Sequence, residues 1–176
     1  MKPRILVSRE VFDETLAMLT EHFDVESNQA DVRHSTDALA ALLADKDGAV
    51  ISTSDRIDAS VLARAPKLKV VSNVGVGYNN LDIAACTAAG VMATNTPGVL
   101  TDSVADYTFG LVIATCRRMT EGEHMLRSGE WKGSFLKQML GADVHGATLG
   151  IMGMGRIGQT VARRALGFDM KVIYNN

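Results

Sequence analysis

The chain has 176 residues, of which 47% are hydrophobic and 5% aromatic, and its 18 basic and 20 acidic side chains give a net charge of −2. This length allows one ordinary domain or two small ones, and the near-zero charge argues against a nucleic-acid partner. No apolar run is long enough for a signal peptide or a membrane-spanning helix, so we expect a cytoplasmic protein with no membrane partner.

The first half of the chain alternates short apolar runs with segments of helical period. Five runs have the composition of buried strands, the second only weakly: residues 4–8, 23–27, 49–52, 68–71 and 91–94. Helices are expected between them, over about 11–23, 37–46, 58–65 and 81–89. Strands that alternate with short helices require a parallel sheet covered on both faces, so this half is predicted to be an α/β unit.

The pattern changes at Asn95-Thr-Pro97-Gly98, where we expect a hinge between two domains. Ser103 and Asp106 have the spacing of a capping box, and from there a helix of about 16 residues should run to Arg117-Arg118. This helix is apolar on nearly every side, which indicates burial in a large body or against a partner. Cys86 and Cys116 stand alone within predicted helices, which favours packing roles over a disulfide or a metal site.

A polar helix from Met119 to Gly129 and an irregular arm over residues 130–144 are expected next. The arm carries five apolar side chains predicted to be exposed: Trp131, Phe135, Leu136, Met139 and Leu140. Apolar residues on a long loop are usually covered, and a second subunit would cover these. The sequence therefore predicts a homodimer through residues 101–145.

The strongest motif is Gly153-Met-Gly155-Arg-Ile-Gly158, which follows a predicted strand over 148–152 and opens a helix. A second strand, 171–174, comes at the distance that a dinucleotide-binding unit requires. Gly153 permits the turn, Gly155 has no Cβ to obstruct a pyrophosphate, and Gly158 lets the helix approach the strand. The free amides and the positive end of the helix dipole then face an anion. The alternative is a plain strand-to-helix turn.

Together these features resemble the D-isomer-specific 2-hydroxyacid dehydrogenases, in particular the glyoxylate/hydroxypyruvate reductase branch. The segments that carry the resemblance stand in the family's order and span essentially the whole chain: residues 74–82, 93–98, 100–106, 129–131 and 146–158. The resemblance implies a flavodoxin-like, parallel-sheet substrate-binding domain over residues 1–98. Over residues 99–176 it implies the dimerisation helix and arm and the first βαβ unit of a truncated Rossmann domain. The implied activity is reduction of a small 2-oxo acid to the D-2-hydroxy acid with NAD(P)H.

The resemblance also assigns binding residues. It implies that the backbone amides of the Gly75-Val76-Gly77 loop hold the substrate carboxylate, with Val76 also near the nicotinamide. The alternative is a plain turn that ends a strand.

Further cofactor contacts are implied for Thr101, Arg156 and Ile157, beside the three glycines of the motif. Thr101 could equally be a helix cap, and Arg156 could simply face solvent. Asn176 stands where NAD enzymes place an acidic residue that binds the ribose hydroxyls. Because no acid here repels a 2′-phosphate, we predict that NADP(H) is favoured over NAD(H).

No catalytic residue and no metal ligand are assigned. The family's catalytic arginine, glutamate and histidine lie further along than residue 176, and the histidines of this chain are predicted to be solvated: His22, His34, His124 and His145. The first Rossmann strand would also keep one edge unpaired. We therefore expect a fragment of a longer gene product that is inactive by itself. The alternative is a chain whose last 30 residues are poorly ordered or held by a partner.

Two other interpretations stay open. One is a nucleotide-sensing interaction protein, like the corepressor relatives of this fold, and the other is a non-catalytic dimerisation module. Nucleotide binding without turnover would favour the first, and a stable dimer without nucleotide binding would favour the second. The identity of the 2-oxo acid depends on loops from both domains.

Overall fold

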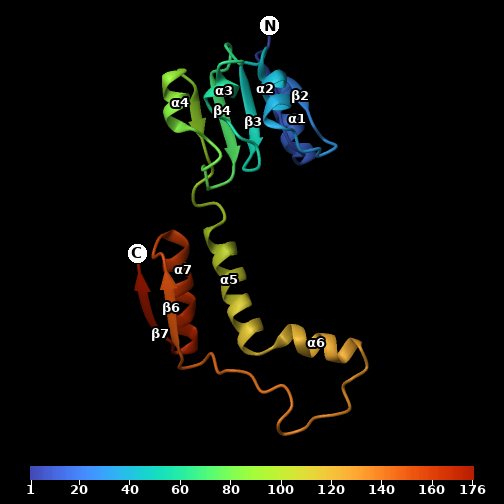
Figure 1. Cartoon of the computed structure of the whole chain (residues 1–176), viewed down its shortest axis with the longest axis vertical. Helices are drawn as coiled ribbons and strands as arrows, with labels where there is room; N and C mark the ends of the chain where they lie inside the picture. The colour runs from blue at the N-terminus through green and yellow to red at the C-terminus, as the bar shows by residue number, and fades with distance from the viewer. The chain divides into compact units, whose positions relative to one another are not determined.

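A computed structural model describes all residues, 1–176 (Figure 1). The chain forms two compact units, Met1–Pro97 and Gly98–Asn176. None of the helices combines the length and the apolar character needed to cross a bilayer.

A five-stranded parallel sheet forms the centre of the first unit, in the order β2-β1-β3-β4-β5. The strands are β1 (Arg4–Val7), β2 (Asp24–Ser27), β3 (Gly48–Ser52), β4 (Val70–Val74) and β5 (Met92–Thr94). This is the flavodoxin-like strand order, and the predicted α/β fold with a parallel sheet is confirmed. Because all strands run the same way, the loops that follow them gather at one edge, where doubly wound sheets bind ligands.

Four helices connect these strands: α1 (Asp13–His22), α2 (Thr36–Leu43), α3 (Ala59–Leu62) and α4 (Ile83–Ala88). Side chains cap three of them, since Ser35 accepts from the Ala38 amide, Asp58 from two amides of α3 and Asp82 from the Ala85 amide. Helix α3 has four residues and is shorter than predicted. The chain tightens into i→i−3 hydrogen bonds directly after it, ahead of Pro66.

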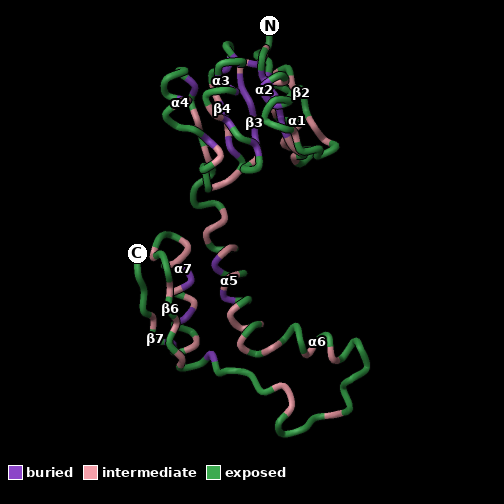
Figure 2. The backbone as a smooth tube through the Cα atoms, in the orientation of Figure 1, coloured by how far each residue is buried: buried purple, intermediate pink, exposed green.

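The hydrophobic core of the first unit joins strand residues to α2, α3 and α4, and buried segments appear purple in Figure 2. Leu6, Ile51 and Val71 of the sheet pack in one cluster with Leu39 and Leu43 of α2. Free Cys86 of α4 is buried in the same cluster, whereas α1 contributes no buried residue.

The second unit contains a parallel β-α-β arrangement and two preceding helices. Its elements are α5 (Thr101–Cys116), α6 (Met119–Arg127), β6 (Thr148–Met152), α7 (Arg156–Ala165), the 3-10 turn η1 (Leu166–Phe168) and β7 (Lys171–Asn175). Phe109 of α5 and Val161 of α7 share a buried cluster, and the Phe109 and Phe168 ring centroids lie 4.9 Å apart. Strand β6 pairs only with β7, so the prediction that one of its edges stays unpaired is confirmed.

The predicted capping box at the start of α5 is wrong. The helix begins at Thr101, and Leu100 before it provides no side-chain cap. Ser103 already lies inside the helix, where its hydroxyl donates to the Leu100 carbonyl at 3.1 Å. The Asp106 carboxylate instead accepts a hydrogen bond from Arg164 of α7.

Apolar side chains of the long helix and the arm reach the surface. In α5 only Ala105 and Phe109 are buried. Exposed large hydrophobic residues from α5 through α6 to the arm are Tyr107, Leu111, Met119, Leu126, Trp131, Phe135, Leu136 and Leu140. Met139, which was predicted to be exposed, is half-buried, because its methyl group approaches Gly122 of α6.

Candidate functional site

The loop Gly75–Gly77 follows β4 at the carboxyl edge of the sheet. Each of its three carbonyl oxygens accepts a hydrogen bond from another part of the first unit. The donors are the Thr96 amide to Gly75 at 3.0 Å, the Asn95 side chain to Val76 at 2.8 Å and the Asn73 side chain to Gly77 at 2.8 Å. No hydrogen bond within the chain uses the N–H groups of Val76, Gly77 or Tyr78. Consecutive amides that are free in this way form an anion-binding surface.

A buried relay of polar groups supports the loop from behind. Asn73 is 1% exposed, and its Oδ1 accepts from Asn80 Nδ2 at 3.1 Å. Asn80 Nδ2 also donates to the Asp55 carbonyl at 2.9 Å. The Asp55 side chain in turn accepts from Ser8 Oγ at 2.5 Å and from the Ser52 amide at 2.9 Å. The relay thus links the ends of β1, β3 and β4.

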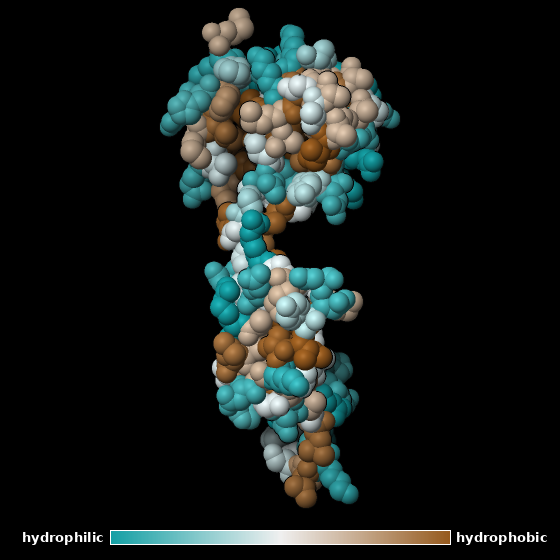
Figure 3. Space-filling model, turned by 90° about the vertical axis from the view of Figure 1, so that its left-hand side faces the viewer, coloured by the Kyte–Doolittle hydropathy of each residue, from teal (hydrophilic) through white to brown (hydrophobic).

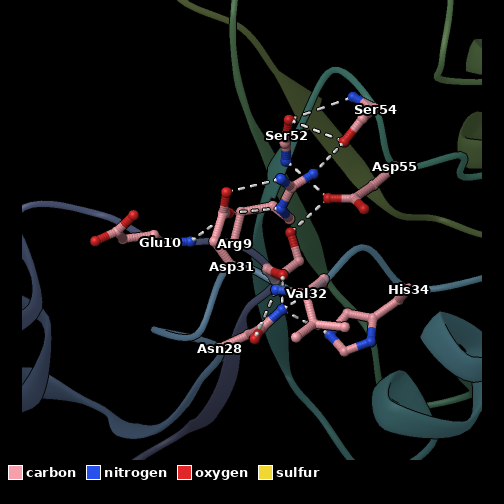
Figure 4. A network of polar contacts seen from close by, with 10 residues as sticks. Arg9, Glu10, Asn28, Asp31, Val32, His34, Ser52, Ser54 and Asp55 are labelled. Carbon is pink, nitrogen blue, oxygen red and sulfur yellow. Dashed lines mark hydrogen bonds and ion pairs between the residues drawn. The ribbon is translucent and has the colours of Figure 1, made fainter.

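A second polar cluster holds the loops after β1, β2 and β3 together (Figure 4). The Arg9 guanidinium forms a two-point ion pair with Asp31, at 2.7 and 2.9 Å, and donates to Ser54 Oγ at 2.8 Å. The hydrogen bond between them raises the pKa of Arg9 and lowers the pKa of Asp31, so both stay charged near neutral pH. Arg9 and Asp31 also line a cavity of about 210 Å³ that reaches Val74, the residue before the loop.

The glycine turn of the second unit lies between β6 and α7. Gly153 has φ of +93°, a backbone conformation that other residues rarely adopt. A Cβ at Gly158 would lie 2.2 Å from the Gly153 carbonyl oxygen, so glycine is needed there for close packing. A Cβ at Gly155 would meet no atom within 4 Å, so this position faces open space.

The first turn of α7 is electrostatically suited to an anion. No side chain caps the helix, and its first turn contains no acidic residue. The unpaired amides and the positive end of the helix dipole therefore stay available. Arg156, the first residue of the helix, is exposed, and Ile157 is half-buried.

Asn176 is held against the same turn. Its Oδ1 accepts from the Met154 amide at 2.6 Å, and the Asn175 carbonyl accepts from the Gly153 amide at 2.7 Å. The residue after β7 is therefore next to the glycine turn. Thr101, the remaining predicted cofactor contact, is half-buried at the first position of α5 and does not cap it.

The sequence did not predict that four residues support the loop Gly75–Gly77, although Asn95 was placed in the expected hinge: Asn73, Asn80, Asn95 and Asp55. The predicted strand, residues 68–71, ended before Asn73, whereas β4 runs on to Val74 and includes it. The contact between Asn95 and the loop joins positions 19 residues apart, which only the folded chain brings together.

Three comparisons place this geometry among known proteins. A sequence model of the D-isomer specific 2-hydroxyacid dehydrogenase catalytic domain matches residues 5–170. The glyoxylate reductase of Thermococcus onnurineus is 46% identical, over 100% of this chain and 54% of its own length. The chain spans about half the length of the curated relatives it matches.

Solved structures agree with this relationship. A protein of Thermus thermophilus superposes with a TM-score of 0.90 at 40% identity, over 97% of this chain and 55% of its own. The NADPH-dependent glyoxylate/hydroxypyruvate reductase of Sinorhizobium meliloti, solved with NADP and malonate, has a TM-score of 0.83 at 34% identity. That match covers 100% of this chain and 54% of the reductase.

Proposed function

The chain belongs to the D-isomer specific 2-hydroxyacid dehydrogenase family, and from this premise we propose that the full-length protein reduces a small 2-oxo acid to the D-2-hydroxy acid with NAD(P)H. Glyoxylate and hydroxypyruvate are the favoured substrates, since relatives at 40–46% identity carry the name glyoxylate reductase and the similar Sinorhizobium meliloti enzyme is named a glyoxylate/hydroxypyruvate reductase. The observation that carries the proposal is the loop Gly75–Gly77, with its carbonyls bound and its amides free.

The substrate carboxylate would accept hydrogen bonds from the Val76 and Gly77 amides. Such charge-assisted bonds are stronger than neutral ones, and they hold the acid by the end that does not react. Binding at this end fixes the direction of the neighbouring 2-oxo group, which is a positioning contribution to catalysis. Val76 would also approach the nicotinamide.

The cofactor pyrophosphate would bind at the glycine turn. The open space beyond Gly155 and the uncapped first turn of α7 fit a diphosphate group, and exposed Arg156 adds a positive charge. Gly153 and Gly158 shape the turn, while Ile157 and Thr101 complete the proposed contacts. When bound, the nicotinamide supplies the hydride.

We propose that NADP(H) is preferred over NAD(H). Asn176 contacts the glycine turn through Met154 and carries no negative charge, so a 2′-phosphate would meet no repulsion there. The similar reductase of Sinorhizobium meliloti is named as NADPH-dependent.

Residues 1–176 alone are proposed to be inactive. The reaction needs a group that gives a proton to the developing alkoxide, and no histidine of the chain is placed for it. His22, His124 and His145 are exposed, and His34 lies 3.1 Å from the Asn28 amide nitrogen.

A homodimer through residues 101–145 is proposed. Hydrophobic side chains, brown in Figure 3, reach the surface at the lower end of the view, where Figure 1 places α6 and the arm. Leu136 is 91% exposed and Phe135 is 62% exposed. Exposed apolar patches on a protein surface often mark the sites where another protein binds.

Turnover of the purified full-length protein tests the proposal. NADPH and NADH oxidation is measured with glyoxylate, hydroxypyruvate and pyruvate, and residues 1–176 alone serve as the inactive control. Hydroxypyruvate also reports the product's configuration, because the glycolate formed from glyoxylate has no stereocentre. Nucleotide binding without any turnover would contradict the enzyme and favour a sensing protein. A tenfold preference for NADH would contradict the cofactor assignment.

A further inference from the structure

We propose that Asn95 is a positioning residue for carboxylate recognition, acting through the backbone of the substrate loop. The inference rests on the proposed function, because it assumes that the loop Gly75–Gly77 binds the 2-oxo acid. Asn95 is proposed to contact neither the substrate nor the cofactor. It fixes the direction of one of the two amides that do the binding.

The geometry of a peptide group links the carbonyl of one residue to the amide of the next. A trans peptide is planar, so its C=O and its N–H point in opposite directions, and the chain contains no cis peptide bond. The Val76 carbonyl and the Gly77 amide belong to the same peptide group. When Asn95 Nδ2 binds the Val76 carbonyl at 2.8 Å, it therefore directs the Gly77 N–H to the opposite side, where this N–H has no hydrogen-bond partner within the chain.

The same relation holds for the two neighbouring peptide groups. The Thr96 amide binds the Gly75 carbonyl at 3.0 Å and so orients the Val76 N–H. Asn73 Nδ2 binds the Gly77 carbonyl at 2.8 Å and so orients the Tyr78 N–H. Three successive carbonyls are thus directed inward, and three successive amides are left for an anion.

Of the three donors to the loop carbonyls, Asn95 is the one whose side chain we expect to affect carboxylate binding most. The peptide group that it holds is followed by a glycine, whose backbone rotates with little steric resistance. Asn73 is secured within the sheet by Asn80, and Thr96 acts through its main chain, which a substitution does not remove. The Asn95 side chain is half-buried and lies outside the hydrophobic core, so its replacement should spare the fold.

Two variants of the full-length protein, Asn95→Ala and Asn95→Ser, test the inference. Steady-state constants are measured for a 2-oxo acid, for its uncharged carboxamide and for NADPH, together with inhibition by oxamate, which does not react. We expect KM for the acid and the inhibition constant of oxamate to rise about three- to tenfold, the worth of one hydrogen bond. The ratio of kcat/KM for the acid to that for the carboxamide should fall, while KM for NADPH stays unchanged.

Ser35→Ala is the matched control. It also removes one hydrogen bond between a side chain and the backbone in the first unit, at the cap of α2, and should leave the preference for the acid unchanged. Thermal unfolding of all three variants distinguishes a variant that does not fold from a folded variant that binds the acid less well. If Asn95→Ala does not fold, the kinetic constants of Asn95→Ser test the inference.

Each outcome has a distinct meaning. An unchanged ratio of acid to carboxamide in folded Asn95 variants would overturn this inference alone, as would equal losses for acid and NADPH. Absence of turnover by the unaltered protein would overturn the proposed function and this inference with it.

Discussion

A side chain at Gly75 would require a neighbouring residue, Thr53, to move. A Cβ there would lie 2.4 Å from Thr53 Cγ2, a methyl group on the loop after β3. At Gly77 the same construction meets no atom within 4 Å. The two glycines of the loop Gly75–Gly77 thus differ, since a side chain would meet Thr53 at Gly75 and no protein atom at Gly77.

We predict that Gly75→Ala lowers kcat/KM for the 2-oxo acid about tenfold, because the clash displaces the loop amides. Thr53→Ser removes the clashing methyl group and keeps the hydroxyl, so the double variant should recover most of the activity. Steady-state kinetics of both single variants and the double variant measure this coupling. Strictly additive losses would show that Thr53 is not the obstacle.

The charge at residue 176 should set the choice of cofactor. Asn176→Asp keeps an oxygen for the Met154 amide and adds a negative charge beside the glycine turn. The ratio of kcat/KM for NADPH to that for NADH should fall about tenfold or more, because the carboxylate repels the 2′-phosphate and accepts from ribose hydroxyls.

Asn175→Asp is the control for that variant, since it adds the same charge one residue earlier, where side chains alternate in direction along the strand. An equal change of cofactor preference in both variants would point to a general field effect and not to contact by residue 176.

In the strand-turn-helix of the second unit, two glycines are expected to have different roles. Gly158 allows close packing, whereas Gly155 faces the space proposed for the cofactor. Gly158→Ala should lower the free energy of unfolding by about 1–3 kcal/mol, because the new methyl group meets the Gly153 carbonyl. Gly155→Ala should barely change stability yet weaken NADPH binding at least tenfold, since its methyl group enters the proposed pyrophosphate space. Thermal unfolding and nucleotide titration of the full-length variants compare the two. Normal NADPH affinity in Gly155→Ala would contradict the proposed cofactor site.

Helix α3 should depend on the ionised form of its cap. Hydrogen bonds from Ser60 and Arg56 lower the pKa of Asp58 from 3.8 to about 2. A group whose pKa is lowered by folding stabilises the protein fully above its unfolded pKa, and the contribution is lost as the pH falls through the folded value. Asp58→Ala should therefore cost about 1 kcal/mol near neutral pH, with the difference from the unaltered protein narrowing below pH 4.

Asp58→Asn provides the comparison, because asparagine is an equally good helix cap that does not titrate. Urea unfolding of the three proteins across the acid range gives the free energies. A difference between Asp58→Ala and the unaltered protein that stays constant down to pH 3 would contradict the role of the carboxylate.

The elements that sequence reasoning predicted correctly are those fixed by local patterns. Apolar runs located the strands of the first unit. The cap of α2 is also a local feature, because the Ser35 hydroxyl and the Ala38 amide that donates to it lie three residues apart. The predicted capping box of α5 was wrong because Asp106 interacts with a residue far away in the sequence. Arg164 of α7 donates a hydrogen bond to the Asp106 carboxylate. The polar relay behind the loop Gly75–Gly77 was missed for the same reason, since its members come from three strand ends.

For the molecule as a whole, the sequence was enough to predict the family, but it was not enough to predict how the proposed site is built. The family followed from five sequence blocks in order, and it is shown by the match over residues 5–170. The sequence did not predict how the proposed binding residues are arranged relative to one another. The chain spans about half the length of its curated relatives, and the loop and the glycine turn lie in separate units.

The exposed apolar side chains of the arm lead to a prediction about the oligomeric state of the full-length protein. The double variant Phe135→Glu with Leu136→Glu should convert the proposed dimer to a monomer, because buried charges without partners oppose association. Both side chains are exposed within this chain, at 62% and 91%, so the fold of the second unit does not depend on them. Leu166→Glu is the control, since Leu166 is 69% exposed and lies outside residues 101–145. Light scattering of the full-length proteins gives their masses. A dimer that survives the double variant but not Leu166→Glu would place the interface on η1 and away from the arm.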